Sequence, residues 1–460
     1  MDWDDLAECL VDQLGAGVVF RDSVVREGYA SDETRDRHCL PDLVVKPGTV
    51  EAVSRILAFC HQRNLPVTPR GGGSGVSGGA LAVQGGVVLC LERLNHIGTP
   101  DKRNMTIEVE TGAITADVQD LLLGQGYCLP PDPGSRTWCQ IGGNLAHTAA
   151  GPKSVKYGAF KDYVLNLQVV LPSGEIIWTG ANVRKFATGY NLTALMLGSE
   201  GTLGVITRVV FRVIAAPEAE ILLRLAFPRL EQACELICRV FETGLVPSEV
   251  EFMEADAIAA AQRACQGGAP PGTAAMVWVG FDGPVEEALM DDAGRLSALA
   301  EELGASEVLF AGETQHKQAL WSYRHQVGPA VIEQTPFRDV DVSFPRGALL
   351  QVVTGVKEIG KRRGFRTVIF GHAGDGNLHV NVCRDNLDDD AWQGEVKAGI
   401  AEIYQLAVEL GGTLSGEHGI GCTLVEHMQA AFGPTYVALL KGIKQVFDPK
   451  GILNPGKILL

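Results

Sequence analysis

The segment that most restricts the fold is a glycine-rich loop in the first quarter of the chain. It reads Arg70-Gly71-Gly72-Gly73-Ser74-Gly75-Val76-Ser77-Gly78-Gly79, and an apolar run at Gly86–Leu91 follows it. Gly73–Gly78 matches the G-x-G-x-x-G dinucleotide pattern, but that pattern requires a helix directly after it. Here small residues lead into a strand instead. We therefore expect a loop whose backbone N–H groups form an anion-binding nest, with a purely structural turn as the simpler alternative.

The bulk composition predicts a globular protein that binds neither nucleic acid nor an anionic membrane. A chain of 460 residues is too long for one core, so two or three domains are expected. The net charge of −16 gives no basic face for a polyanion. The acidic N-terminus has no apolar signal segment, no run is long enough to span a membrane, and the 11 cysteines contain no CxxC pair. These features favour a cytoplasmic location with reduced thiols.

The apolar periodicity predicts a mixture of helices and strands in both halves of the chain. A helix is expected from Val50, with Thr49 as its cap, until about Asn64. A loop-rich stretch is expected over 130–158. The best candidate domain boundary is Ala215-Ala216-Pro217-Glu218. Strands are expected at Val164–Leu171, Glu175–Thr179, Gly204–Val213 and Ala274–Phe281, and helices at Leu230–Phe241, Val285–Leu303 and Val396–Leu410.

The most informative stretch is Gly371-His372-Ala373-Gly374-Asp375-Gly376-Asn377-Leu378-His379-Val380-Asn381. It reads as two strands joined by a glycine turn, so that His372 can converge on His379 across the turn. Two imidazoles at one point suit a divalent ion that also needs an anionic ligand. The segment Ser415-Gly416-Glu417-His418-Gly419-Ile420-Gly421 offers a carboxylate on a second glycine-flanked loop. The alternative is a group of histidines that only hydrogen-bond within a polar core.

Several blocks of sequence together resemble one known family. They are Pro69–Gly75, Pro130-Pro131-Asp132-Pro133-Gly134-Ser135, Ile141-Gly142-Gly143-Asn144, Gly198–Thr207 and Asp448–Lys457. Their order and spacing resemble the vanillyl-alcohol oxidase-like FAD-binding family, which includes FAD-linked D-lactate and glycolate dehydrogenases. The resemblance runs from about residue 35 to the end of the chain.

This resemblance implies a two-domain α+β flavoprotein. The FAD-binding domain would consist of two α+β subdomains, beside a cap domain with an antiparallel sheet and helices. The expected divisions are 1–35 as an N-terminal segment on the FAD domain, 36–216 as the FAD-binding domain, 217–415 as the substrate or cap domain with the metal site, and 416–460 as a C-terminal segment that returns to the flavin.

The resemblance also implies the residues that bind FAD. They are Arg70, Gly71, Gly72, Gly73, Ser74, Gly75, Pro133, Gly142, Gly143, Asn144, Glu200, Gly201, Ile206 and Asn454. Family members that attach flavin covalently use a His or Cys, often in the first loop. Residues 69–80 contain neither, so FAD is expected to bind non-covalently. His147 departs from the family, where Glu or another polar residue is more usual.

In the D-2-hydroxy-acid dehydrogenase branch, the two histidine motifs look like a metal site beside a catalytic base. The resemblance implies that a divalent metal such as Zn, Fe or Mn is bound by His372, His379 and Glu417, and that His418 is the catalytic base. His418 and Asn381 would contact the substrate, and Arg324 resembles the residue that binds its carboxylate. The expected reaction is oxidation of a small D-2-hydroxy acid, with hydride transfer to flavin N5 and loss of the hydroxyl proton.

The choice of acid depends on two positions. The D-2-hydroxyglutarate branch has a hydroxy-amino acid and a Lys where this chain has Gly328 and Asp339. Because Asp339 would repel a second carboxylate, D-lactate or glycolate is favoured as the substrate. Arg338 or Arg346 could still bind the second carboxylate of a dicarboxylic acid. Three competing functions are a D-2-hydroxyglutarate dehydrogenase, a non-catalytic FAD-binding subunit, and a metal-free aryl-alcohol oxidase. Electrons would pass to a quinone, a cytochrome, an electron-transfer flavoprotein or an iron–sulfur partner, and a partner could hold the protein at a membrane.

Overall fold

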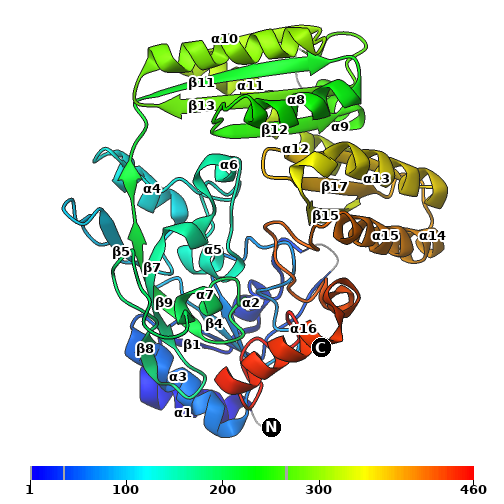
Figure 1. Cartoon of the computed structure of the whole chain (residues 1–460). Coiled ribbons are helices and arrows are strands. Elements are labelled where there is room, and N and C mark those ends of the chain that lie inside the picture. The colour runs from blue at the N-terminus through cyan, green and yellow to red at the C-terminus, as the bar shows by residue number, and fades with distance from the viewer. Residues whose placement is uncertain (1–2, 35–36, 265–267, 460) are drawn as a thin grey trace. The chain divides into compact units, whose positions relative to one another are not determined.

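A computed structural model describes residues 3–34, 37–264 and 268–459. The chain divides into two units, each of which is drawn in Figure 1. Unit 1 consists of Met1–Ala150, Gly158–Ala216 and Glu417–Leu460, and unit 2 consists of Gly151–Tyr157 and Pro217–Gly416. Of the N-terminal segment expected over 1–35, residues 1, 2 and 35 lie outside the described part of the chain.

The first sheet of unit 1 has four strands in the order β1-β2-β4-β3. They are β1 (Val19–Phe20), β2 (Leu43–Val45), β3 (Val67–Arg70) and β4 (Val87–Cys90), and β4 runs parallel to both β2 and β3. Strand β3 leads directly into the glycine-rich loop, and β4 follows that loop without an intervening helix. The dinucleotide-fold interpretation of Gly73–Gly78 is therefore excluded.

The helix that joins β2 to β3 forms as its apolar pattern predicts. It is α3 (Val50–Arg63), which begins where the Thr49 hydroxyl accepts the amide N–H of Ala52. It ends at Asn64, whose φ of 54° is left-handed. The apolar face is buried in the core of this part of unit 1, together with the first helix, α1 (Trp3–Leu14).

The second sheet of unit 1 is antiparallel, in the order β5-β9-β7-β8. Its strands are β5 (Thr106–Glu110), β7 (Val164–Val170), β8 (Ile176–Trp178) and β9 (Val205–Arg212), which confirms the predicted hairpin and the predicted strand over 204–213. A two-stranded ribbon pairs β6 (Tyr127–Cys128) with β10 (Ile214–Ala215). The remaining helical segments of the unit are α2 (Ser23–Glu27), α4 (Thr115–Leu123), α5 (Ile141–His147), η1 (Phe160–Tyr163), α7 (Leu192–Met196), η3 (Val425–His427) and α16 (Met428–Phe447).

The stretch 130–158, which we expected to be loop-rich, contains two short helices, α5 and α6 (Ser154–Tyr157). Helix α5 includes Gly142 and Gly143, and glycine lowers helix propensity, so the sequence carries little helical signal. Packing explains the glycine, because a Cβ at Gly142 would lie 3.0 Å from Cβ of Thr111. Close packing in the tertiary structure thus overrides local preference here.

Unit 2 is built on one antiparallel sheet of seven strands, in the order β14-β11-β13-β12-β16-β17-β15. Its strands are β11 (Ala219–Phe227), β12 (Glu249–Glu254), β13 (Ala275–Gly283), β14 (Glu307–Ala311), β15 (Phe337–Ser343), β16 (Arg366–His372) and β17 (Asn377–Cys383). The helices are α6, α8 (Leu230–Glu242), α9 (Ala255–Ala264), α10 (Glu286–Glu302), α11 (Thr314–His325), α12 (Val327–Gln334), η2 (Arg346–Ala348), α13 (Leu349–Arg363), α14 (Asp389–Gln393) and α15 (Glu395–Glu409).

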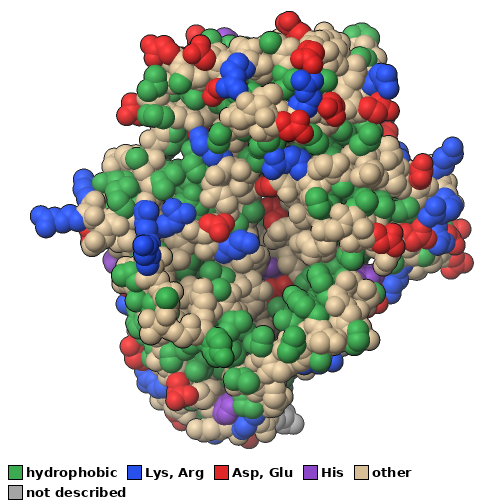
Figure 2. All heavy atoms as spheres, viewed as in Figure 1, with side chains coloured by type: hydrophobic (Ala, Val, Ile, Leu, Met, Phe, Trp, Pro, Cys, Tyr) green, Lys and Arg blue, Asp and Glu red, His purple; other side chains and the backbone are tan. Residues whose placement is uncertain are grey.

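The predicted α+β class is confirmed, since both units combine sheets with helices. Helices α8, α10 and α15 form where the apolar periodicity predicts them. Acidic and basic side chains are interspersed over the part of unit 2 around α10, as Figure 2 shows. Among the described residues, no helix combines the length and the apolar character needed to cross a membrane.

Candidate functional site

In unit 1 the glycine-rich loop lies directly against a second segment singled out from the sequence. A Cβ added at Gly72 would lie 2.6 Å from the carbonyl oxygen of Trp138. One added at Gly71 would lie 3.5 Å from the backbone nitrogen of Gly143. At Gly72 only a residue without a side chain allows this approach, whereas the distance at Gly71 is an ordinary van der Waals contact, so the loop packs closely against the segment around residues 138–143.

Arg70 supports this loop from the protein side. Its Nη2 donates to the carbonyl of Ser31 at 2.8 Å, and its Nη1 donates to the carbonyl of Tyr29 at 3.3 Å. The guanidinium also lies over the Tyr29 ring, and burial lowers its pKa. Arg70 therefore connects the start of the glycine loop to the N-terminal segment through these hydrogen bonds.

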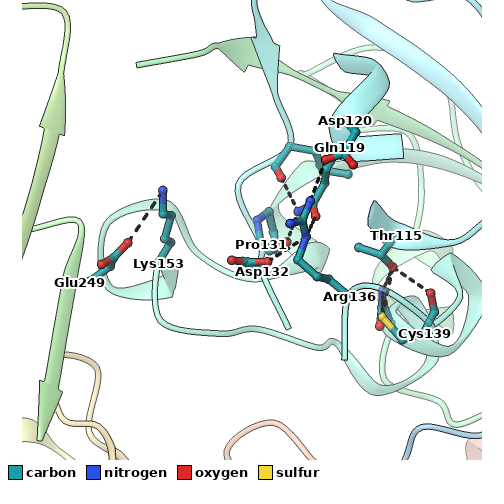
Figure 3. Close-up of polar contacts among 11 residues, drawn as sticks. Thr115, Gln119, Asp120, Pro131, Asp132, Arg136, Cys139, Lys153 and Glu249 are labelled. Carbon is teal, nitrogen blue, oxygen red and sulfur yellow. Dashed lines mark hydrogen bonds and ion pairs between the residues drawn. The ribbon is translucent and has the colours of Figure 1, made fainter. Parts of the chain in front are cut away.

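The segment that carries Pro133 is held by a network from α4, which Figure 3 shows. Gln119 donates to the carbonyl of Pro131 at 2.7 Å, and Arg136 donates to the Gln119 side-chain oxygen at 2.9 Å. Arg136 also forms an ion pair with Asp120 at 2.9 Å. A few residues further on, the Asn144 amide donates to the Thr115 hydroxyl at 2.6 Å. Both predicted cofactor segments are thus fixed to the same helix.

Glu200 and Asn454 join three distant segments of unit 1. Glu200 has a φ of 50°, is buried, and its carboxylate accepts the amide N–H groups of Ile420 at 2.7 Å and Gly421 at 2.8 Å. The Asn454 amide donates to the carbonyls of Gly79 and Glu200, at 2.9 and 2.7 Å. The glycine loop, the 198–206 segment and the C-terminal segment therefore meet at one place. Ile206 is buried there, and its carbonyl accepts the Thr111 hydroxyl.

His418 is held through its backbone in the same unit as the glycine loop. Its carbonyl oxygen accepts the Ser77 hydroxyl at 2.9 Å and lies 3.1 Å from Nδ1 of His147. Because a carbonyl only accepts, Nδ1 of His147 carries the proton in this contact. His147 departs from the family pattern and was expected as a wall of the flavin site; the structure places its ring in contact with the His418 backbone.

In unit 2 the two predicted histidines come together as the strand pattern predicts. Strands β16 and β17 pair antiparallel, and the rings of His372 and His379 have centroids 5.5 Å apart with an interplanar angle of 83°. Along β17, buried apolar residues occupy every second position, at Leu378, Val380 and Val382. His379 lies between them on the opposite face and is half-buried. The alternation places the imidazoles on the polar face of the hairpin.

Glu251 of β12 was not predicted as a site residue, yet it contacts two residues that were, His372 and Arg324. Its carboxylate contacts Nδ1 of His372, and it accepts from Nη2 of Arg324 at 2.6 Å and from Nε at 2.9 Å. Burial alone raises the pKa of Glu251, but the charges of His372 and Arg324 outweigh it and hold the pKa at about 2. The strand Glu249–Glu254 alternates glutamate with apolar residues at its start, and a glutamate that becomes buried there requires partners.

Arg324 lies near the end of α11 and is buried. Besides Glu251, its guanidinium lies over the Phe370 ring at 4.8 Å. Asn381 is buried on β17 and donates to Asp339 of β15 at 3.0 Å. Its Oδ1 has no hydrogen-bond partner within the described ranges, although it is buried. An unpaired buried acceptor is costly, which indicates a place for a ligand.

Asp341 fixes the loop that precedes Glu417. It is the cross-strand neighbour of His379, and it accepts the Ser415 hydroxyl at 2.7 Å and the Gly416 amide at 2.9 Å. The Asn377 amide donates to its other oxygen at 2.6 Å. Glu417 follows Gly416 directly in the chain, so the residue just before this carboxylate is fixed to β15.

The fold and these residues define a class of flavoenzyme, which comparison with known sequences identifies. Residues 41–180 match the FAD binding domain family, and residues 216–458 match the C-terminal domain of FAD linked oxidases. The chain belongs to the family of FAD-linked oxidases, and it is an FAD-linked oxidoreductase.

Its relatives span nearly the whole chain. The D-lactate dehydrogenase of Anaerostipes hadrus is 36% identical over 425 residues, which is 91% of this chain and 89% of the relative. The glycolate oxidase subunit GlcD of Bacillus subtilis (strain 168) is 32% identical over 94% of this chain and 91% of the relative.

A solved structure supports the fold. p-Cresol methylhydroxylase with substrate bound aligns with a TM-score of 0.83 over 99% of this chain and 96% of that chain, at 17% identity. The predicted vanillyl-alcohol oxidase-like fold is thus confirmed.

Proposed function

We propose that this enzyme oxidises a small D-2-hydroxy acid, D-lactate or glycolate, to the 2-oxo acid with non-covalent FAD. The observation that carries the proposal is the pair of imidazoles of His372 and His379, whose ring centroids lie 5.5 Å apart. The buried, unpaired Oδ1 of Asn381 belongs to the same strand, two residues after His379. An aryl-alcohol oxidase without metal has no use for such a cluster. Relatives named D-lactate dehydrogenase and glycolate oxidase subunit support the substrate class.

The residues present fit a divalent metal. His372 and His379 offer nitrogen, and Glu417 offers an oxygen, which together could hold Zn, Fe or Mn. Glu251 engages Nδ1 of His372, so Nε2 is the nitrogen that would bind the ion. When bound, the metal would lower the pKa of the substrate hydroxyl and hold its oxygen.

His418 would accept the hydroxyl proton, since a neutral imidazole nitrogen can act as a general base. The contacts from Ser77 and His147 use the His418 carbonyl, so they orient the residue without using its ring. When bound in unit 1, FAD would accept the hydride from Cα at N5. The glycine loop, Asn144, Glu200 and Asn454 would enclose it, with the other cofactor residues predicted from the sequence.

Arg324 would bind the substrate carboxylate. Its Nε and Nη2 are used by Glu251, which leaves Nη1 of the guanidinium for the substrate. Asn381 would contact substrate oxygen through its unpaired Oδ1. Asp339 lies 3.0 Å from the Asn381 amide and would repel a second carboxylate, which favours a monocarboxylate over D-2-hydroxyglutarate.

FAD, when bound, would supply the hydride acceptor, and turnover would then require a further electron acceptor. A relative is itself named as a subunit, which favours a partner protein as the route to the quinone, cytochrome, electron-transfer flavoprotein or iron–sulfur acceptor. We place the enzyme in the cytoplasm, with any membrane association mediated by that partner.

Anaerobic mixing with D-lactate, L-lactate, glycolate and D-2-hydroxyglutarate tests the proposal. Rapid loss of the visible absorbance of oxidised flavin with D-lactate or glycolate is expected. Bleaching by D-2-hydroxyglutarate alone would overturn the argument from Asp339. Bleaching by none of the acids would contradict the enzymatic role.

A further inference from the structure

Glu251 is a fully buried carboxylate on β12, in the seven-stranded sheet of unit 2. It lies on β12 opposite Trp278 of β13, and its exposed fraction is 1%. Burial of a charge in such a place costs several kcal/mol unless hydrogen bonds and opposite charges compensate. A residue that only filled space here would be apolar, so its partners must explain the glutamate.

Its two oxygens reach two different functional side chains. Oε1 contacts Nδ1 of His372, and Oε2 accepts both Nη2 and Nε of Arg324, at 2.6 and 2.9 Å. The three residues come from β16, β12 and α11, three separate elements of unit 2. One carboxylate therefore fixes an imidazole and a guanidinium relative to each other.

Each contact restricts what its partner can do. A proton on Nδ1 of His372 is held by Glu251, which makes Nε2 the lone-pair nitrogen and sets the ring orientation. The guanidinium is planar, so the Oε2 contacts together with the Phe370 ring also fix the direction of Nη1. Loss of the carboxylate would release both groups at once.

We propose that Glu251 is a positioning residue that couples the metal-binding face of His372 to the carboxylate-binding face of Arg324. This inference rests on the proposed function, since it gives Glu251 a role through those two residues. A hydroxy acid that is bound through both its hydroxyl and its carboxylate requires the two protein groups that bind them to lie at a fixed separation. The carboxylate of Glu251, which contacts both His372 and Arg324, fixes that separation.

The chain offers a matched control on the same strand. Glu254 is also buried on β12, but its carboxylate is held by Lys357 at 2.9 Å and by the amide of Ile369. Glu254→Gln therefore perturbs a buried ion pair in the same sheet without touching His372 or Arg324. Any effect shared by Glu251→Gln and Glu254→Gln reports on packing alone.

The test measures metal affinity of the FAD-loaded enzyme by competition between Mn²⁺ and a chelator, together with KM and kcat. Glu251→Gln should weaken Mn²⁺ binding roughly 10–100-fold and raise KM, and Glu254→Gln should leave the affinity within about twofold. Equal losses in both variants, or unchanged affinity in Glu251→Gln, would overturn the proposal. If Glu251→Gln does not fold, Glu251→Asp serves, because its shorter arm cannot satisfy both partners.

A second readout separates this inference from the proposed function. Nitrogen NMR of histidine-labelled, metal-free protein should show His372 as the Nδ1–H tautomer, and this signal should change in Glu251→Gln but not in Glu254→Gln. If the wild type shows this tautomer but binds no Mn²⁺, the metal assignment fails while the Glu251 contact stands. If the tautomer is the same in all three proteins, the positioning role itself is wrong.

Discussion

Ser415 donates its hydroxyl to Asp341 across 2.7 Å, and this contact ties the loop before Glu417 to strand β15. The Gly416 amide donates to the same oxygen, while Asn377 donates to the other. Asp341 uses only its acceptor capacity in these contacts, so an ionised carboxylate suits the position. The position of Glu417 thus depends on a residue that is not itself a proposed ligand.

Asp341→Asn should weaken metal binding by roughly tenfold or more, because one oxygen becomes an NH2 group that cannot accept. The substitution must sacrifice either the Asn377 contact or the two contacts from the loop. Chelator competition measures the change. Asp291→Asn, on the exposed side of α10, is the control. Equal metal affinity in both variants would show that the loop does not depend on Asp341.

Gly72→Ala should destabilise the FAD-free protein by about 1–3 kcal/mol, because its Cβ would lie 2.6 Å from the Trp138 carbonyl. Flavin retention should fall with it. Gly75→Ala is a control from the same loop, since a Cβ there meets no protein atom within 4 Å. Urea unfolding of both apoproteins gives the comparison, and similar stabilities would contradict the close approach of the two segments.

His418→Asn should slow flavin reduction by about 10²–10⁴-fold, the usual contribution of a positioned base. FAD content should stay the same, because Ser77 and His147 contact only the backbone carbonyl. Single-turnover reduction measures the rate. His316→Asn, on the exposed face of α11, should behave like the wild type. An undiminished rate in His418→Asn would assign the base to another group.

Glu249 should make the stability of unit 2 depend on pH. Burial raises its pKa to about 7, although Lys153 lies 3.8 Å away, a pair that Figure 3 shows. An unfolded glutamate titrates near pH ~4.3, so the folded state holds an extra proton between these values. The contribution of protonated Glu249 to the free energy of unfolding is therefore present at low pH and is lost as the pH rises through about 7.

Glu249→Gln should remove that part of the pH dependence of the free energy of unfolding. Urea unfolding of wild type and variant across this pH window measures it. Glu301→Gln, an exposed substitution at the end of α10, should keep the wild-type profile. Parallel profiles for wild type and Glu249→Gln would show that Glu249 does not titrate in this way.

The strongly periodic elements could be predicted from the sequence, and the glycine-rich ones could not. Helix α3 and the β16–β17 hairpin have regular apolar spacing and clear turn residues, so local pattern and tertiary structure agree. Helix α5 contains two glycines, and packing against Thr111 explains the one at Gly142. Local propensity carries no information about such a contact.

The candidate site shows the same division. His372 and His379 are close in sequence, so their convergence follows from strand geometry. Glu251 and Arg324 are 73 residues apart on a strand and a helix, and no spacing rule connects them. The contact of Glu200 with the Ile420 amide spans 220 residues, and a backbone donor leaves no trace in the sequence at all.

The central claim is that a metal held by His372, His379 and Glu417 takes part in oxidation of the hydroxy acid. The most direct test is anaerobic flavin reduction by D-lactate, before chelation, after chelation, and after Mn²⁺ or Zn²⁺ is restored. Reduction that stops on chelation with FAD still bound, and returns with the metal, is the predicted result. Reduction that continues at the same rate in the fully metal-free enzyme would contradict the account.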